Sequence, residues 1–284
     1  MSSPLSTRAR VLAAICGLLA LPAANAAWQL NLPPGVTEIS RRAYDLHMLV
    51  LWVCVVVGGA VFAVMIYALV TFRKSKGARA ATWDHSTTAE IIWTALPVLV
   101  LVFLAVPAAR DLVFIEDTRG SETTIKITGF QWKWNYEYVD QGVNFYSSLA
   151  QTSNVARQRN SGIDPSSVEH YLLEVDRPLV IPAGVKIRYL LTSNDVNHAW
   201  WMQPFGIKRD AIPGYINEGW FKVDEPGTYR GQCAELCGKD HGFMPIVVEV
   251  LPKEKFEAWL AEQKAGTQVA TAPAVTSVVA TSGT

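Results

Sequence analysis

Two thiols, an imidazole and a thioether lie within twelve residues near the C-terminal end of the chain. They occur in the segment 231–245, GQCAELCGKDHGFMP, as Cys233, Cys237, His241 and Met244, and a further imidazole, His198, lies upstream. Soft sulfur ligands stabilise Cu(I) and imidazole nitrogen also accepts Cu(II), so this set of donors suits copper better than the other common metals. The pattern predicts a copper site that carries electrons.

The two cysteines, Cys233 and Cys237, have a simpler alternative. Two neighbouring thiols in an exported protein can form a disulfide across a short loop. A site for one copper ion needs a single cysteine, whereas a second thiol permits a centre of two copper ions bridged by both sulfurs. The concentration of five candidate ligands in this part of the chain favours the metal site over the disulfide.

The N-terminal third of the chain predicts export and membrane insertion. Residues 1–26 contain two arginines, an apolar stretch and an Ala-x-Ala end, which is the pattern of a secretory signal peptide cleaved before Ala27. Two longer apolar stretches predict membrane helices at about 46–72 and 89–110. The connecting loop, 73–88, is rich in Lys and Arg and is therefore expected in the cytoplasm, which leaves both termini outside.

Glu90 lies at the start of the second apolar stretch, at the predicted cytoplasmic boundary. An ionisable group at membrane depth is a candidate for function. The alternative is an acid at a helix N-terminus, stabilised by the helix dipole and by Ser or Thr caps at 86–88. The residues alone leave both explanations open.

The sequence after the membrane segments predicts a soluble β domain. Apolar and polar residues alternate in segments such as 123–128 and 186–191, with turn signals between the segments. Many short strands separated by turns indicate a sandwich or barrel, which we assign to residues 111–264. In it we expect His198 to end one strand and the loop 233–244 to lead into the last, so the candidate ligands can meet at one end.

Other segments of this domain have weaker patterns. Residues 141–170 are polar and predict an irregular excursion between strands. The segment 172–181 predicts a strand broken by Pro178, and 253–264 predicts a short amphipathic helix. The tail, 265–284, has no charged residue and is rich in Ala, Val, Thr, Ser and Gly, and we expect it to be disordered.

Four aromatic residues alternate along one segment, namely Trp132, Trp134, Tyr136 and Tyr138. In a strand they would all point to one face. Four large rings with polar atoms are difficult to bury together, so at least one is expected at the surface. An exposed Trp near copper would be a place for electrons to enter.

Charge is divided unevenly along the chain, which has no net charge overall. From Asp111 onward there are 21 acidic and 16 basic residues, so this part has a net charge of −5. A negative domain attracts a basic partner and speeds the encounter. The same sign argues against binding to nucleic acid.

Several separated motifs resemble subunit II of the haem-copper cytochrome c oxidases, of the bacterial type made with a signal peptide. The resemblance extends from about residue 27 to residue 262 and includes both apolar stretches, EIIWTALP, QWKWNYEY, LEVD, DAIPG and the cysteine-rich loop. The sequence departs from the family in 141–170, at Phe130 and at Lys133. The resemblance implies a two-helix transmembrane hairpin followed by an all-β, cupredoxin-like sandwich or barrel.

The resemblance also implies a ligand set. In the family, a binuclear copper centre, CuA, takes two bridging sulfurs, two imidazoles, one thioether and one backbone carbonyl. The corresponding residues here are Cys233, Cys237, His198, His241, Met244 and, for the carbonyl, Glu235. The side chain of Glu235 is expected to bind a magnesium or manganese ion at the boundary with subunit I.

Further roles follow from the same resemblance. Trp132 matches the residue through which cytochrome c passes its electron, and Glu90 matches the carboxylate at the mouth of a proton channel of subunit I. Four residues resemble the docking surface for cytochrome c: Gln131, Glu137, Asp195 and Asp240. Lys133 adds a positive charge close to that surface.

The function implied is a one-electron relay in the bacterial inner membrane, with both termini in the periplasm. Reduced cytochrome c donates to CuA, which passes the electron to haem in subunit I. Oxygen reduction to water, coupled to proton pumping, is expected at the haems and CuB of that partner. Subunit III and membrane lipid are further expected partners, and nucleic acid is not.

Rival functions remain as alternatives. A quinol oxidase subunit would lack the copper ligands, and a nitrous-oxide reductase would need no two-helix anchor. A copper-binding assembly protein or chaperone of thioredoxin type would use two cysteines and a histidine but requires a βαβ pattern. A non-catalytic anchor subunit with a Cys233–Cys237 disulfide is the remaining alternative.

Overall fold

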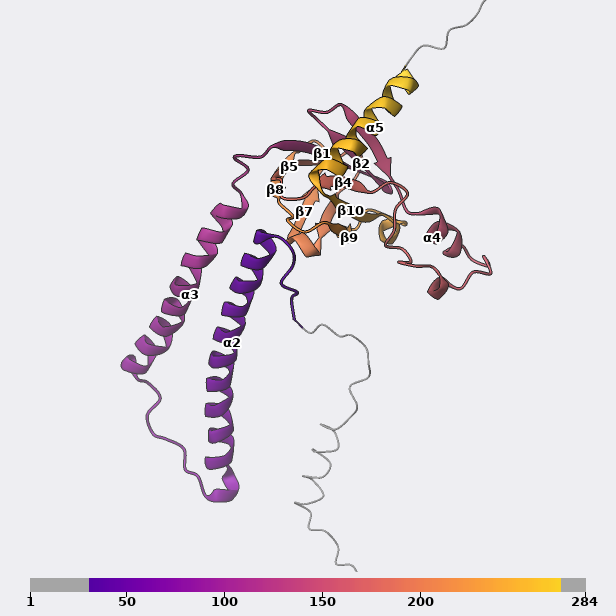
Figure 1. The fold of residues 1–284 in the computed structure, drawn as a ribbon. Coiled ribbons are helices and arrows are strands. Elements are labelled where there is room, and N and C mark those ends of the chain that lie inside the picture. Colours follow the sequence, from indigo (N-terminus) through magenta and orange to yellow (C-terminus); the bar gives the residue numbers. More distant parts are fainter. Residues whose placement is uncertain (1–30, 272–284) are drawn as a thin grey trace, which may run out of the picture. The chain divides into compact units, whose positions relative to one another are not determined.

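The computed structural model describes residues 31–271, and side chains only as far as residue 265 (Figure 1). The predicted signal peptide, 1–26, lies outside the described residues. The described residues from 34 onward belong to one compact unit. The description that follows concerns the described residues of that unit.

Two long helices, α2 (Glu38–Thr71) and α3 (Thr87–Ile115), contain the apolar stretches. Both are long and apolar enough to cross a membrane, and their most apolar windows contain no buried residue. A short 3₁₀ turn, η1 (Lys74–Lys76), lies between them. Each helix is longer than its apolar core because polar residues continue it at the ends.

Caps explain where these helices begin. The Thr37 hydroxyl accepts a hydrogen bond from the Ser40 amide at 3.0 Å, and the Ser40 hydroxyl accepts one from the Thr37 amide at 2.9 Å, which is a capping box. Ser86 caps α3 by accepting from the Ala89 amide at 3.4 Å. Arg42, near the start of α2, lies 3.4 Å from Asp111, near the C-terminal end of α3, and so links the two helices there.

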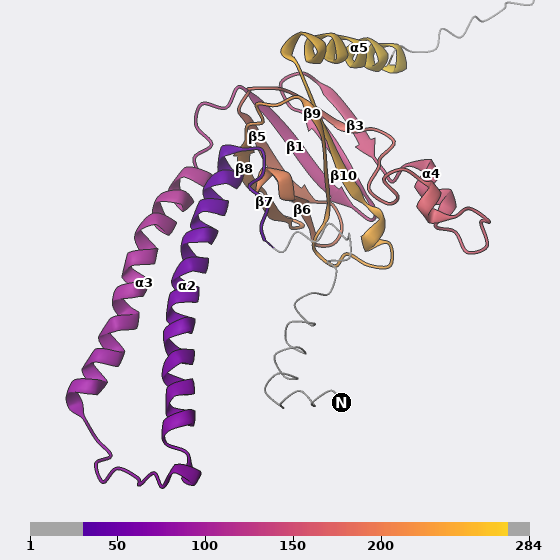
Figure 2. The same cartoon turned by 60° about the horizontal axis from the view of Figure 1, so that its bottom comes forward.

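The β domain consists of two five-stranded sheets, in the orders β3-β2-β1-β5-β8 and β4-β10-β9-β6-β7 (Figure 2). The strands are β1 (Thr123–Phe130), β2 (Lys133–Tyr138), β3 (Val143–Ser147), β4 (Leu179–Pro182), β5 (Ile187–Ser193), β6 (His198–Met202), β7 (Ile207–Ala211), β8 (Asn217–Phe221), β9 (Gly227–Cys233) and β10 (Pro245–Leu251). Alternate residues of β1 and β5 are buried between the sheets, as expected for a sandwich. The predicted hairpin of two apolar helices followed by a β-sandwich is confirmed.

Pairing within the sandwich is mixed. β1 pairs in parallel with β5, and β10 in parallel with β4, whereas the other neighbouring strands are antiparallel. β8 and β9 follow one another in the chain but belong to different sheets. The turn between them therefore carries the chain from one layer of the sandwich to the other.

The structure corrects several local predictions. His198 begins β6 rather than ending a strand, and the strand predicted from 172 starts only at Leu179, after Pro178. The excursion 141–170 is not irregular throughout, because it includes β3, α4 (Gln151–Ala156) and a 3₁₀ turn, η2 (Pro165–Ser167). β3 has a weak sequence pattern, but it forms a strand because it pairs with β2. Only the tertiary structure supplies that pairing.

The C-terminal helix is also longer than predicted. α5 extends over Lys253–Thr271, so the backbone of 265–271 is helical where disorder was expected, and 272–284 lies outside the described residues. A helix that is already nucleated gains one hydrogen bond for each residue added, so weak formers can continue it. Phe256 and Trp259 anchor its first turns against Tyr138.

The aromatic cluster is divided between core and surface. Trp134, Tyr136 and Tyr138 point from β2 into the core and are fully buried, whereas Trp132 precedes the strand and is only half-buried. Their polar atoms have partners. The Trp134 indole donates to the Met244 carbonyl at 3.4 Å, and the Tyr136 hydroxyl accepts from the Trp200 indole at 3.5 Å. The Tyr138 hydroxyl donates to the Val180 carbonyl at 2.5 Å and accepts from the Val180 amide at 3.1 Å. Three rings can be buried together because these hydrogen bonds offset the loss of water.

Gly231 offers a test of the close contact between β9 and β6. A Cβ at this position would overlap the Trp201 carbonyl oxygen, so we expect Gly231→Ala to lower the free energy of unfolding by about 1–3 kcal/mol. Gly227→Ala in the same strand is the matched control, because its Cβ would have its nearest neighbour at 3.6 Å. Denaturant unfolding of the full chain in detergent, followed by Trp fluorescence, measures both. Equal stabilities for the two variants would contradict the packing described.

Candidate metal centre

The candidate ligands come together at one end of the second sheet. His198 is the first residue of β6, and Cys233 is the last residue of β9. These strands pair antiparallel with Trp200 opposite Cys233, and the Ala234 amide donates to the Ala199 carbonyl at 3.0 Å. The register therefore places the start of β6 beside the end of β9.

The loop from β9 to β10 supplies the remaining candidates. It contains Cys237, then the 3₁₀ turn η4 (His241–Phe243), and it ends at Met244, immediately before β10. Because its two ends belong to the neighbouring antiparallel strands β9 and β10, the loop turns back at the edge of the sheet where β6 begins. This return is what brings the second imidazole and the thioether to the first pair of ligands.

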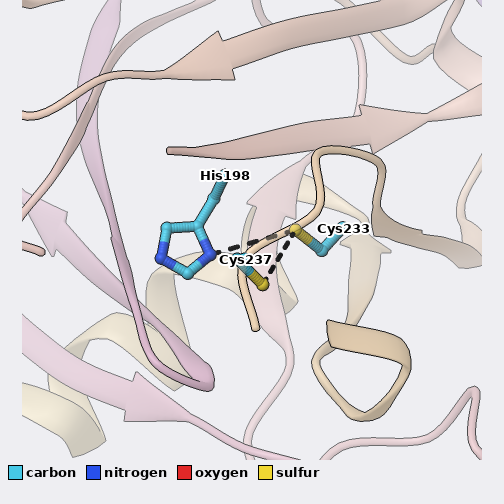
Figure 3. A group of neighbouring side chains, drawn as sticks. All are labelled: His198, Cys233 and Cys237. Carbon is cyan, nitrogen blue, oxygen red and sulfur yellow. Dashed lines mark hydrogen bonds between the residues drawn. The ribbon is translucent and has the colours of Figure 1, made fainter. Parts of the chain in front are cut away.

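Three side chains form the buried part of the site (Figure 3). Cys233 Sγ lies 3.9 Å from His198 Nδ1 and 3.9 Å from Cys237 Sγ. All three ligand atoms lie within 4.8 Å of one another, and all three residues are buried. The two sulfurs are well beyond the disulfide bond length of about 2.05 Å, so both thiols are free in this structure.

Three further donors complete the group. Cys237 Sγ lies 3.4 Å from His241 Nδ1 and 3.5 Å from Met244 Sδ. The Glu235 carbonyl oxygen lies 3.4 Å from Cys233 Sγ. Thiolates, imidazoles and a thioether form a soft donor set that fits copper, and the structure thus brings together all six predicted ligands.

A carboxylate orients one of the imidazoles. His198 Nε2 lies 2.9 Å from Asp195 Oδ1, which leaves Nδ1 facing Cys233. Such a partner fixes the tautomer and the ring orientation of a ligating histidine. The other face of the ring lies against Gly129, where an added Cβ would approach His198 Cδ2 to 2.8 Å.

Ionisation at the site reflects burial. Burial raises the pKa of the Cys237 thiol, and the neighbouring Cys233 raises it further. Metal binding must therefore displace protons from the thiols. Partial burial acts to raise the pKa of Asp195, but hydrogen bonds from His198 and two backbone amides outweigh it and hold the pKa below its ordinary value.

Trp132 is attached directly to a ligand residue. Its indole Nε1 donates to the Cys237 carbonyl oxygen at 3.1 Å, and the Gln131 side-chain amide donates to the same oxygen at 2.9 Å. The Lys239 ammonium lies 5.6 Å from the centre of the indole ring. The half-exposed ring thus connects the surface with the backbone of the site.

The acids predicted to dock a partner already have partners within the chain. Asp195 holds His198, Glu137 lies 3.5 Å from Lys126, and Asp240 lies 3.4 Å from Arg157. The sequence analysis did not assign Asp195 this structural role, although a carboxylate three residues before a candidate histidine ligand could have suggested a hydrogen bond between them. The contact between Arg157 and Asp240 could not be predicted in this way, because the two residues lie 83 positions apart in the chain.

Glu90 and Glu235 lie outside the donor cluster in different ways. Glu90 is in the first turn of α3, and its carboxylate lies 2.8 Å from His85 Nδ1, a partner that the sequence did not suggest. The Glu235 side chain is exposed although its carbonyl faces the thiols. Its carboxylate is therefore accessible from outside the domain.

Comparison with known proteins gives two family matches. Residues 123–251 match the family model described as cytochrome C oxidase subunit II, periplasmic domain, and residues 25–110 match the transmembrane domain of the same subunit. Both matches agree with the division into a β domain and two apolar helices.

Individual relatives cover most of the chain. "Probable cytochrome c oxidase subunit 2" of Rickettsia bellii is 35% identical over 237 residues, which are 83% of this chain and 84% of the relative. The mitochondrial cytochrome c oxidase subunit 2 of Vigna unguiculata is 36% identical over 267 residues, which are 93% of this chain and 70% of the relative. The solved periplasmic domain of subunit II of Bradyrhizobium japonicum cytochrome oxidase is 41% identical, covering 52% of this chain and 98% of its own, with a TM-score of 0.45.

The hydrogen bond between Asp195 and His198 predicts an effect on copper affinity. Asp195→Ala removes the partner of Nε2 and frees the ring to rotate, so we expect copper affinity to fall about 10- to 100-fold. Asp140→Ala, at an exposed acid of the same domain, is the matched control and should leave the affinity unchanged. Titration of the full chain in detergent against a copper chelator measures the affinity. An unchanged affinity for Asp195→Ala would show that the ring needs no such support.

Proposed function

Because the chain belongs to the cytochrome c oxidase subunit II family, we propose that it accepts electrons from reduced cytochrome c at a binuclear copper centre, CuA, and passes them to haem in subunit I. As a subunit of this oxidase it is part of an oxidoreductase, and it is a membrane protein. Oxygen reduction to water, coupled to proton pumping, takes place on the partner chain in this proposal.

The convergence of six donors around two free thiols is the observation that supports this proposal most. Two sulfurs 3.9 Å apart, each with an imidazole nitrogen within 3.9 Å, are suited to hold two metal ions rather than one. Copper supplies a one-electron couple at such a site. The chain supplies the ligands, their orientation and the exclusion of water.

The protein frame explains how the ligands can stay in place through a change of oxidation state. His198 is fully buried, and its ring is confined between Asp195 and Gly129. Cys233 is fixed by the β9 ladder and Met244 by the start of β10. Ligands held by paired strands move little, and a small geometry change favours rapid electron transfer.

Trp132 is the proposed place where electrons enter. Its ring is half-exposed, and its N–H bonds directly to the carbonyl of the ligand residue Cys237. The β domain, with its net charge of −5, would attract a basic donor such as cytochrome c. Docking through Gln131, Glu137, Asp195 and Asp240 stays a proposal, in which the last three carry charges already shared with neighbours in the chain.

Glu235 and Glu90 have proposed roles at the boundary with subunit I. The exposed carboxylate of Glu235 would bind magnesium or manganese together with that subunit, while its carbonyl faces Cys233. Glu90, beside His85 at the start of α3, would lie at the mouth of a proton channel. Subunit III and lipid complete the proposed set of neighbours.

The proposed topology follows the distribution of charge. A signal peptide, 1–26, is removed, the basic loop 73–88 stays in the cytoplasm, and both termini lie in the periplasm of a bacterial inner membrane. The domain after residue 110 is then periplasmic, on the side of the membrane where a soluble cytochrome c can reach it. A copper chaperone of thioredoxin type fits less well, because the described fold is a two-sheet sandwich.

Copper content is the direct test of the proposal. We expect the full chain, purified in detergent and loaded with copper, to hold two copper ions and to absorb in the near infrared. Cys237→Ser should reduce the copper content and abolish that absorption, whereas Cys54→Ser in α2, an exposed thiol far along the chain from the ligands, should change neither. A chain with a Cys233–Cys237 disulfide and no copper would support the non-catalytic anchor instead.

Trp132→Phe tests where electrons enter. The variant keeps an aromatic ring but loses the hydrogen bond to the Cys237 carbonyl, so the ring is no longer held against the ligand. We expect electron transfer from reduced cytochrome c to slow roughly tenfold, which corresponds to about 1.4 kcal/mol and to the loss of one such bond. Stopped-flow reduction of the assembled oxidase at low ionic strength measures the rate. Trp201→Phe, in β6, is the control, and equal rates for both variants would count against this route.

A further inference from the structure

One cation from the excursion between β3 and β4 contacts the turn that carries two of the ligands. Arg157, which follows α4, has Nη1 3.4 Å from Asp240 Oδ1, and its Cζ lies 4.2 Å from the centre of the Phe243 ring. Asp240 directly precedes His241, and Phe243 directly precedes Met244. A single guanidinium therefore contacts the neighbours of two candidate copper ligands.

Arg157 is itself held in position by its own segment. Its Nε donates to Asn154 Oδ1 at 2.8 Å, and its backbone amide donates to the Ser153 carbonyl at 3.0 Å. The hydroxyl of buried Ser153 accepts from the Leu172 amide at 3.1 Å, which closes the excursion on itself. The cation thus projects from a structured support rather than from a free loop.

The support is tied to the strand that ends in Cys233. The Ala150 amide donates to the Glu174 carbonyl at 2.9 Å, and the Glu174 carboxylate lies 2.6 Å from Arg230 of β9. The excursion is therefore attached to β9 at one side and, through Arg157, to the loop after β9 at the other. The excursion thus contacts both the strand before the ligand loop and the loop itself.

Arg157, Asp240 and Phe243 also lie around a common pocket. This pocket is a cavity of about 170 Å³ that separates the ligand turn from the excursion, with Trp132, Leu149 and Phe243 among its lining residues. Arg157 lies in the wall of this cavity and reaches across to the turn. Exposed ion pairs contribute little, but the side chains of Arg157 and Asp240 are only 22% and 26% exposed, and the guanidinium also stacks on a ring.

We propose that Arg157 is a positioning residue of the copper centre. It holds the turn 240–243 so that His241 and Met244 face Cys237, and it balances the negative charge of Asp240 beside the metal. This inference rests on the proposed function of the site. It gives a role to the excursion 141–170, and it makes Asp240 a structural partner of Arg157 in addition to a proposed docking residue.

The holding role is tested in the full chain in detergent before copper is added. The His241 amide donates to the Gly238 carbonyl at 3.2 Å and the Phe243 amide to the Asp240 carbonyl at 2.9 Å, so the hydrogen exchange of these two amides reports how well the turn is held. We expect Arg157→Gln to speed this exchange roughly tenfold, the factor that corresponds to losing one or two weak contacts. Arg159→Gln, an exposed arginine of the same segment, is the matched control and should exchange as the parent does.

The charge role is tested by the reduction potential of the copper-loaded chain. Arg157→Gln leaves the Asp240 carboxylate unbalanced, which favours the oxidised metal, so we expect the potential to fall by up to about 59 mV, a tenfold change in a one-electron equilibrium. Asp240→Asn should raise the potential, and the double variant should return it close to that of the parent. Arg157→Lys should keep the potential but not the slow exchange, because Lys preserves the charge without the planar stack.

The outcomes separate the two proposals. If the parent chain binds no copper, the proposed function fails. If the parent binds copper but Arg157→Gln leaves exchange and potential unchanged, the positioning role is wrong and the copper centre stands. If Arg157→Gln does not fold, Arg157→Lys decides by exchange alone, and parent-like exchange in that variant overturns the role.

Discussion

The antiparallel pairing of β6 with β9 is the interaction on which the candidate metal centre depends. Trp200 lies opposite Cys233, so His198, two residues earlier in β6, reaches the end of β9 where the loop begins. A shift of one residue in this register would turn the ligands to the other face of the sheet. The close approach at Gly231, where β9 touches the backbone of β6, leaves no room for such a shift.

The polar groups around the site form hydrogen bonds that hold the candidate ligands in place. Asp195 accepts hydrogen bonds from His198, from the amides of Gln131 and Val196 and from the Ser193 hydroxyl, so its charge is used within the chain to hold the imidazole. Gln131 in turn binds the Cys237 carbonyl together with Trp132. The surface proposed to meet a partner is thus the outer side of the same network that orients the candidate ligands, so a partner docked there would contact the groups that support the metal centre.

Much of the architecture could be predicted because its signals are local. The length and apolarity of α2 and α3, the alternation in β1 and β5, and the turns between strands each depend on residues close together in the chain. The excursion 141–170 could not be predicted in the same way. β3 forms by pairing with β2, and α4 is held by the hydrogen bond from the Leu172 amide to the Ser153 hydroxyl. The sequence pattern of neither segment predicts these contacts.

The sequence by itself determined the kinds of donor, their order in the chain and the membrane anchor, because chemistry and hydropathy belong to the residues themselves. Only the tertiary structure decided which groups support the donors. The contacts of Trp132 with Cys237 and of Arg157 with Asp240 join residues 105 and 83 positions apart. Residues near these positions in the chain do not indicate such contacts, because the contacts form only when the strands have paired in register and the ligand loop lies beside the start of β6.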